Sequence, residues 1–280
     1  MTSESARHET LPVALPGTSR PWQYSVSHSE LEIRGVAAGG AVTRRWMAGP
    51  ANLVAMVARL SKSRGQHVDN LLRAAQVDQS EIEVSGPSAL RRLAPVLGLH
   101  PADLFVLAGL DVPSDLAPCA APAGSILDHL VKTALLLPSE QREHLLGAAR
   151  SMRPPEPAVP IVREPDRFPY GPGAVIVRLL RNRNLDSLNS AKMVYRLAGI
   201  GPLSAATINV VGLGGKELDP QLLSGFATVL SYRVEDLAAL IDIEVPQALP
   251  PADTASRQVA ELIWEVRHLS ADQLRALQES

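Results

Sequence analysis

Apolar residues recur at helical spacing along most of this chain. They stand three and four positions apart from residue 52 onward, and the spacing returns in the second half of the chain, as at Leu53, Met56, Val57 and Leu60 and at Val175, Ile176, Leu179 and Leu180. A repeat of about 3.6 residues places such side chains on one face of a helix. The pattern therefore predicts a largely helical protein.

One stretch near the N-terminus alternates like a strand. Trp22, Tyr24 and Val26 fall on one side, Leu31 and Ile33 follow, and the chain passes Gly39 and Gly40 before Pro50 ends the region. Alternation with a period of two favours half-buried strands. We expect a small β-hairpin appendage over residues 21–50.

The helical part contains an internal repeat. The segment from Leu93 to Leu97, then Pro101 to Leu104, returns without a gap as Phe226 to Leu230, then Val234 to Leu237. A repeat of this kind fixes architecture, because each copy forms the same supersecondary unit. In each half, the unit reads as a helical bundle followed by a helical hairpin.

These patterns divide the chain into five parts. Residues 1–20 are polar with two prolines and read as a disordered leader, and 21–50 form the β-hairpin appendage. Residues 51–153 are the first helical repeat and 172–280 the second. The proline-dense interval 154–171 is the linker between the repeats.

Composition narrows the class of protein. The chain has 280 residues, 46% of them hydrophobic but only 4% aromatic, and a formal net charge of -2. A chain that is close to neutral offers no overall attraction to nucleic acid, so DNA binding would need a local basic patch. Cys119 is the only cysteine, which excludes an intrachain disulfide. Without a membrane-length apolar run or a signal peptide, we expect a cytoplasmic protein.

The second half resembles a known family. Arg178 to Arg183 precede a short helix that ends at Ala198, Gly199 and Ile200, and Ser204 to Asn209 follow that turn. This order is similar to the five-helix domain of the lambda-repressor-like (XRE-type) helix-turn-helix transcriptional regulators. The resemblance implies two tandem five-helix bundles in an all-α fold; it does not cover the helical hairpin that follows each bundle or the β-hairpin appendage. Small residues at the turn would let its two helices cross closely.

The first copy departs from this pattern. Only residues 78–86 separate Val77 from Pro87, which is too short for a turn, a full recognition helix and a loop. That interval contains Asp78, Glu81 and Glu83 and no Lys or Arg, so a phosphate backbone would be repelled. We expect a degenerate helix-turn-helix in the first repeat, serving as partner or spacer.

The resemblance implies double-stranded DNA as the partner of the second repeat. The segment from Leu203 to Val211 would enter the major groove, with Ser204, Thr207 and Asn209 facing base edges. Cations around it would hold phosphates; the candidates are Arg178, Arg181, Arg183, Lys192 and Lys216. Arg44 and Arg45, beside Trp46, could form an arm on the DNA, although a hairpin end docked through Trp46 explains them as well.

A second class of function stays open. The acidic first copy, together with the apolar Val210 and Val211, also suits an interaction or scaffold protein that has lost contact with DNA. The hairpins carry more apolar surface than an exposed helix tolerates, so they should pack on their bundle, on each other or on a second subunit in a homodimer. No hydrolase signature or metal-ligand spacing occurs, and Gly212 to Lys216 lacks the spacing of a phosphate loop. We therefore expect neither an enzyme nor a cofactor.

Overall fold

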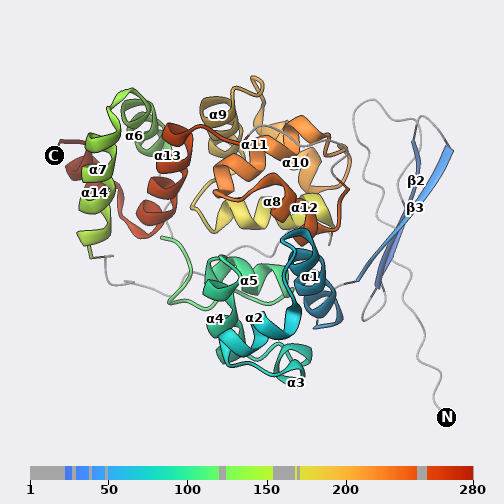
Figure 1. Cartoon of the computed structure of the whole chain (residues 1–280). Helices are drawn as coiled ribbons and strands as arrows, with labels where there is room; N and C mark the ends of the chain where they lie inside the picture. The colour runs from blue at the N-terminus through green and yellow to red at the C-terminus, as the bar shows by residue number, and fades with distance from the viewer. Residues whose placement is uncertain are drawn as a thin grey trace, which may run out of the picture.

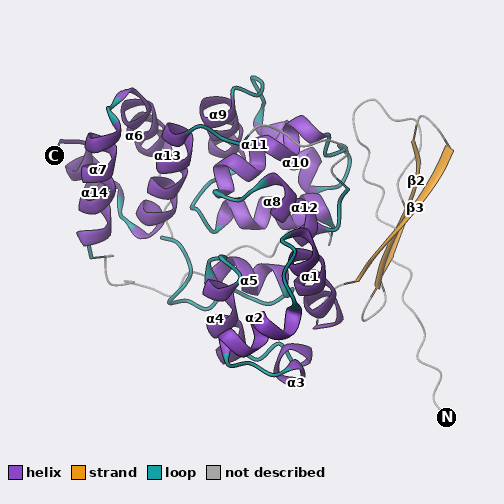
Figure 2. Ribbon diagram, viewed as in Figure 1, coloured by secondary structure: helices purple, strands orange, loops and turns teal. Residues whose placement is uncertain are grey.

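The protein is described here by a computed structural model that covers residues 23–26, 30–37, 40–47, 50–119, 124–153, 168, 171–244 and 251–279, with side chains from residue 53 onward. The predicted leader (1–20) and nearly all of the linker (154–171) lie outside these residues. In the described part, fourteen α-helices make up almost the whole structure (Figures 1 and 2). None of them has the length and apolar character to cross a lipid bilayer.

Three strands precede the helices. They are β1 (Gln23–Val26), β2 (Glu30–Ala37) and β3 (Gly40–Met47), and they pair in the order β1-β2-β3 as an antiparallel sheet. Arg44 and Arg45 lie in β3, where they pair in register with Ile33 and Glu32 of β2. The side chains of this segment are outside the described part of the chain.

Each half of the chain then contributes five helices to a bundle. In the first half these are α1 (Pro50–Ser63), α2 (Val68–Ala75), α3 (Gln79–Glu83), α4 (Pro87–Val96) and α5 (Pro101–Leu107). In the second half they are α8 (Pro172–Arg181), α9 (Ser187–Ala198), α10 (Ala205–Gly212), α11 (Pro220–Leu230) and α12 (Val234–Ile241). The interval 78–86, which is too short for a turn, a full recognition helix and a loop, contains only the five-residue α3, and Asp78 and Glu81 form a capping box at its start.

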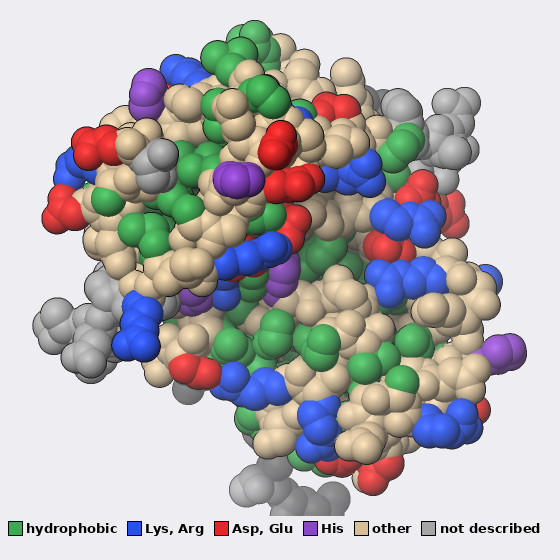
Figure 3. Space-filling view, turned by 60° about the vertical axis from the view of Figure 1, so that its left-hand side comes forward, with side chains coloured by type: hydrophobic (Ala, Val, Ile, Leu, Met, Phe, Trp, Pro, Cys, Tyr) green, Lys and Arg blue, Asp and Glu red, His purple; other side chains and the backbone are tan. Residues whose placement is uncertain are grey.

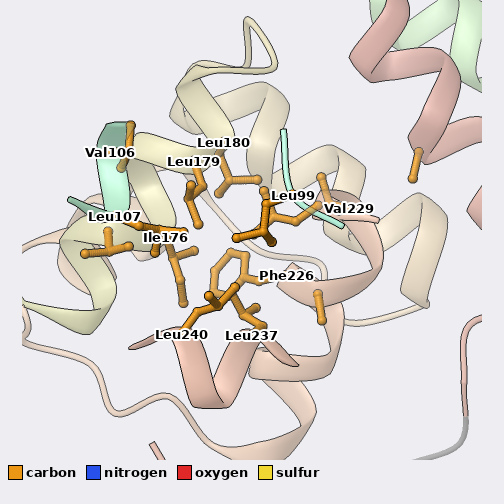
Figure 4. Packing of buried hydrophobic residues seen from close by; sticks show 14 of the residues in the cluster. Leu99, Val106, Leu107, Ile176, Leu179, Leu180, Phe226, Val229, Leu237 and Leu240 are labelled. Carbon is orange, nitrogen blue, oxygen red and sulfur yellow. The ribbon is translucent and has the colours of Figure 1, made fainter. Parts of the chain in front are cut away.

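The two bundles exchange helices. The fifth helix of each half packs more extensively on the first helix of the other half than on that of its own: α1 lies against α12, and α5 against α8 (Figure 1). Figure 4 shows the result in the core, where Leu99, Val106 and Leu107 of the first half lie among apolar side chains of α8, α11 and α12. One continuous core thus joins the two halves, and neither bundle is closed by its own helices alone.

Two ion pairs secure this exchange. Arg64 and Arg183 both follow the first helix of their half, and each stands directly before a residue in the left-handed region, Gly65 (φ 64°) or Asn184 (φ 58°). The Arg64 guanidinium donates to Asp236 of α12 at 3.0 and 2.9 Å, and Arg183 donates to Asp103 of α5 at 3.2 and 2.9 Å. Each arginine therefore reaches into the fifth helix of the opposite half.

The same arginines also bind within their own half. Arg64 donates to the carbonyl of Leu97, at the end of α4, and Arg183 donates to the carbonyl of Leu230, at the end of α11, both at 2.8 Å. These carbonyls terminate helices and lack an intrahelical partner, so the guanidinium satisfies them. The repeat in the sequence thus returns as a pair of equivalent three-way contacts.

The trailing hairpins pack on each other. They consist of α6 (Gly124–Leu136) and α7 (Ser139–Ser151) in the first half, and of α13 (Thr254–Glu265), a 3-10 turn (Val266–His268) and α14 (Ala271–Glu279) in the second. The helices α7 and α13 form the most extensive of these contacts, and α6 lies against both α13 and α14 (Figure 1). The sequence left open whether the hairpins pack on their own bundle, on each other or on a second subunit. In the structure their apolar faces are buried mainly against each other.

Candidate nucleic-acid interface

The segment from α9 to α10 consists of two packed helices joined by a six-residue loop, 199–204. The Asp186 carboxylate caps α9 by accepting the Asn189 amide at 2.7 Å, and α9 ends at Gly199, whose φ of 68° is a conformation that glycine adopts without strain. The Ser204 hydroxyl then caps α10 by accepting the Thr207 amide at 3.1 Å. Helix α10 packs on both α9 and α8.

A close backbone contact fixes the position of α10. A Cβ atom built on Gly173 of α8 would lie 1.9 Å from the Val211 carbonyl oxygen, which is well inside van der Waals contact. No other residue type therefore fits at position 173 unless α10 moves. Ile208 and Val211 form the buried side of α10, so the opposite side of this helix faces outward.

The predicted base readers lie on α10 and at its N-cap, and all three already take part in hydrogen bonds. Ser204 and Asn209 are exposed and Thr207 is half-buried. The Ser204 hydroxyl lies 3.0 Å from the Thr207 hydroxyl, and the Asn209 side-chain oxygen accepts from Ser187 at 2.7 Å. The structure thus places Ser204 and Thr207 next to each other at the start of α10 and Asn209 beside Ser187 of α9, and a base edge would compete with these bonds.

The predicted phosphate contacts are more scattered. Lys216 is exposed in the loop that follows α10, and Lys192 is part-exposed on α9. Arg181 lies over the Phe168 ring at 5.0 Å, and Arg178 donates to the Phe168 carbonyl at 3.2 Å, so both are directed to that residue. The side chains of Arg44 and Arg45 lie outside the described residues.

Arg183 does not lie at this surface. Its side chain is 1% exposed, and it is held by the Asp103 carboxylate and by two carbonyls. A guanidinium that is buried, with both terminal nitrogens already hydrogen-bonded, has no face to offer a phosphate. Arg183 is therefore not one of the candidate phosphate contacts. Its side chain joins the two halves.

Asp128 of α6 takes up much of the positive charge on α9. Its carboxylate oxygens lie 2.6 Å from the Arg196 guanidinium, 3.8 Å from the Lys192 amine and 3.6 Å from the Lys132 amine. Burial opposes ionisation of Asp128, but the Arg196 guanidinium and the two lysines outweigh it and lower its pKa. This contact could not be predicted from the sequence, because α6 belongs to the first half and α9 to the second.

The corresponding region of the first half is acidic. Asp78 and Glu81 cap α3, and the Arg92 side chain pairs with Glu81 at 2.7 Å. The hydrogen bond from the Ser80 hydroxyl lowers the pKa of Asp78, so this carboxylate stays charged at neutral pH. This region therefore presents carboxylates where the second half has the uncharged α10.

A buried polar cluster joins the halves and the hairpins behind this surface. The Asp103 carboxylate accepts from Arg183, from the Asn182 amide at 2.9 Å and from the Tyr232 hydroxyl. Burial raises the pKa of Asp103, but the Arg183 guanidinium reverses that effect and leaves it below the ordinary value. The Trp264 indole of α13 lies 5.3 Å from the Arg183 guanidinium.

Sequence reasoning missed this cluster, although a signal was present. Asp103 and Asp236 occupy equivalent positions in the two repeats, as do Arg64 and Arg183. Charged residues that recur at buried helical positions indicate a shared polar contact, since an unpaired buried charge is costly.

A ligand pocket or a metal site would indicate another kind of function. An open cleft of about 630 Å³ lies beside the turn after α9, but the Thr228 and Ser256 hydroxyls that line it donate to carbonyls of Ser224 and Leu197. Within the described residues, no three His, Cys, Asp or Glu side chains gather closely enough to hold a metal ion. On the face drawn in Figure 3, basic and acidic side chains are interspersed.

No family model, curated protein or solved structure matches this chain.

Proposed function

We propose that the chain is a DNA-binding transcriptional regulator of the lambda-repressor-like type, with α9 and α10 as its helix-turn-helix. The observation that supports the proposal is that α10 packs on α8 and α9 with Ser204 exposed at its N-cap and Asn209 exposed along it. Side chains of this kind read base edges when their helix enters a major groove.

The proposed phosphate contacts are few. Lys216 follows α10 and Lys192 projects from α9, and Arg178 and Arg181 lie at the end of α8. Each phosphate neutralised adds about 0.9 to the slope of log affinity against log salt. With Lys192 and Lys216 as the main contacts, we expect a slope of about -2, which is shallow for a regulator.

The first repeat would position the second instead of reading DNA. The exchanged helices and the packed hairpins already join the two repeats within one chain. The homodimer expected through the hairpins has little apolar surface left, because Leu127, Leu130, Val259 and Ile263 are buried. We propose a monomer as the binding unit, and light scattering of the purified chain at micromolar concentration would overturn this by giving a dimer mass.

Fluorescence anisotropy with labelled genomic fragments tests the DNA proposal. We expect saturable binding at low salt that weakens as salt rises, and a loss of about ten-fold in affinity for Asn209→Ala or Lys216→Ala. Lys62→Ala on α1 is the matched control, since Lys62 is exposed on a different bundle. Absence of binding at low salt would reject the proposal, and full affinity in Asn209→Ala would reject α10 as the reader.

One observation favours the second candidate, a protein that binds other proteins. Helix α10 carries no charge, and Arg196 and Lys192 of α9 are drawn to Asp128. A recognition surface without strong cations suits a protein partner better than a phosphate backbone. The same anisotropy series distinguishes the two candidates, because only the DNA-binding proposal predicts salt-sensitive binding to the genomic fragments.

A further inference from the structure

A mixed apolar and basic surface lies where α6 of the first half meets α9 of the second. Leu136 is 87% exposed, Leu188 51% and Tyr195 50%, and these are three of the five large hydrophobic residues that are exposed in the described chain. Exposed apolar side chains that gather on neighbouring elements indicate an interaction site, whereas isolated ones do not. We define this surface, with Lys132 and Lys192, as the α6–α9 patch.

The five side chains lie on two helices, α6 and α9, that pack on each other. Leu188, Lys192 and Tyr195 are spaced by four and three positions on α9, so they share one helix face, and Lys132 and Leu136 do so on α6. The two faces meet at Asp128, whose Oδ2 atom lies 3.6 Å from the Lys132 amine and 3.8 Å from the Lys192 amine.

The charge of the patch is unbalanced. Lys132, Lys192 and Arg196 surround the single carboxylate of Asp128, and that carboxylate is only 11% exposed while the Lys132 side chain is 50% exposed. A partner would therefore meet excess positive charge flanked by apolar side chains.

We propose that the α6–α9 patch binds an acidic amphipathic segment of a partner protein. Leu136, Leu188 and Tyr195 would bury the apolar face of that segment, and Lys132 and Lys192 would pair with its carboxylates. This binding does not need base reading by α10, since it uses the α6–α9 junction, but it shares Lys192 with the proposed phosphate contacts.

Two other occupants fit the patch less well. A second copy of the chain related by two-fold symmetry would set the patch against itself, and its lysines would repel. A phosphate backbone would match the lysines but would leave Leu136 and Tyr195 without apolar contact. A carboxylate-bearing amphipathic helix satisfies both kinds of side chain.

The test uses the full chain and a fluorescein-labelled peptide that has Leu and Phe on one helical face and Glu on the other. We expect saturable one-to-one binding at low salt. Leu136→Ser and Tyr195→Ser should each weaken it several-fold, and the double charge reversal Lys132→Glu with Lys192→Glu should weaken it about ten-fold. The reversed variant should instead bind the counterpart peptide in which every Glu is replaced by Lys.

Matched controls are available elsewhere on the molecule. Val84→Ser changes an apolar residue that is 78% exposed beyond α3, and Lys62→Glu reverses an exposed charge on α1. Both should bind the acidic peptide as the unaltered chain does. The proposal is overturned if no saturable binding occurs at low salt, if the controls lose as much affinity as the patch variants, or if the charge reversal does not switch peptide preference. It is also overturned if Lys132→Glu abolishes a self-association of the chain.

Discussion

The helix that follows the turn differs most between the two halves of this protein. In the first half it is α3, which spans only Gln79–Glu83, is acidic and is capped by Asp78. In the second half it is α10, which spans Ala205–Gly212, is uncharged and is capped by Ser204. The helices that build the shared core, by contrast, keep their order and their contacts. Packing thus requires similar buried positions in the two halves, whereas the third helix of each half, α3 or α10, can differ in length and charge.

The two interhalf ion pairs show the same divergence in a milder form. Arg183 and Asp103 are 1% and 0% exposed, whereas Arg64 and Asp236 are 20% and 7% exposed. Both pairs do the same structural work, but water reaches only the second. The energetic consequences should differ accordingly, because an unpaired charge in a dry site cannot be solvated.

The largest expected effect comes from removing one partner of the drier pair. Arg183→Ala leaves Asp103 buried with only Tyr232 and Asn182 as donors, so we expect the free energy of unfolding to fall by about 3–5 kcal/mol. Arg64→Ala should cost about 2 kcal/mol, because water can reach Asp236. Urea denaturation of the two variants measures both losses. Equal losses would show that the halves do not differ at these equivalent positions.

The next effect sharpens the contrast by moving α10. Gly173→Ala places a methyl group against the Val211 carbonyl, so we expect a loss of stability of about 1–3 kcal/mol and weaker binding by α10. Gly147→Ala in α7 is the matched control, since a Cβ there meets nothing within 4 Å and should stabilise the helix by about 0.5–1 kcal/mol. Thermal unfolding compares the pair, and a neutral Gly173→Ala would contradict the close contact of α8 and α10.

A pH series addresses the junction between the halves. His100 stacks on Trp264 with ring centroids 3.5 Å apart, and burial lowers its pKa from 6.5 to about 4. The unfolded chain therefore takes up a proton at His100 at a higher pH than the folded chain does. Stability should fall as pH drops from about 6.5 towards 4, by about 2 kcal/mol at this site.

His100→Gln isolates that contribution. The variant cannot titrate, so its stability should depend less steeply on pH between 6.5 and 4, as measured by urea denaturation at a series of pH values. His268, whose pKa burial also lowers to about 4, stays in place and accounts for the remaining slope. An unchanged slope in His100→Gln would contradict a buried, neutral His100.

The smallest effect compares the two caps directly. Asp78→Ala and Ser204→Ala each remove a side-chain acceptor at a helix start, which costs about 1 kcal/mol. Because α3 is a single turn, Asp78→Ala should cost the larger share and loosen the whole segment 78–86, while α10 should stay helical on its buried side. Amide hydrogen exchange reports this difference, and equal protection of the two helices in their variants would contradict it.

Much of the architecture could be predicted from the sequence. Helical spacing predicted most of the helices, and the repeat predicted that Leu93 to Leu97 and Phe226 to Leu230 would build equivalent elements, as α4 and α11 do. For α3, the capping residues were present at Asp78 and Glu81, but a short interval without an apolar stripe gave no periodic signal.

The candidate site was predictable in part. The contact of Ser204 with Thr207 follows from helical spacing, because residues three apart lie on the same side of a helix, whereas Asn209 lies on another side. The fate of the cations does not follow from spacing. Arg183 looks like its neighbours Arg178 and Arg181 in the sequence, yet it is buried against Asp103, which is far away along the chain.

The sequence by itself determined the helical class, the repeated unit and the uncharged character of α10, since local periodicity and composition carry these properties. Only the tertiary structure decided that α1 and α5 pack with α12 and α8, that Arg183 joins the halves, and that α6 meets α9 to form the α6–α9 patch. The physical reason is that helical period gives the direction of an apolar face but not the identity of the helix that covers it. In this chain each half presents equivalent faces, and the choice between them depends on contacts between residues far apart in the sequence.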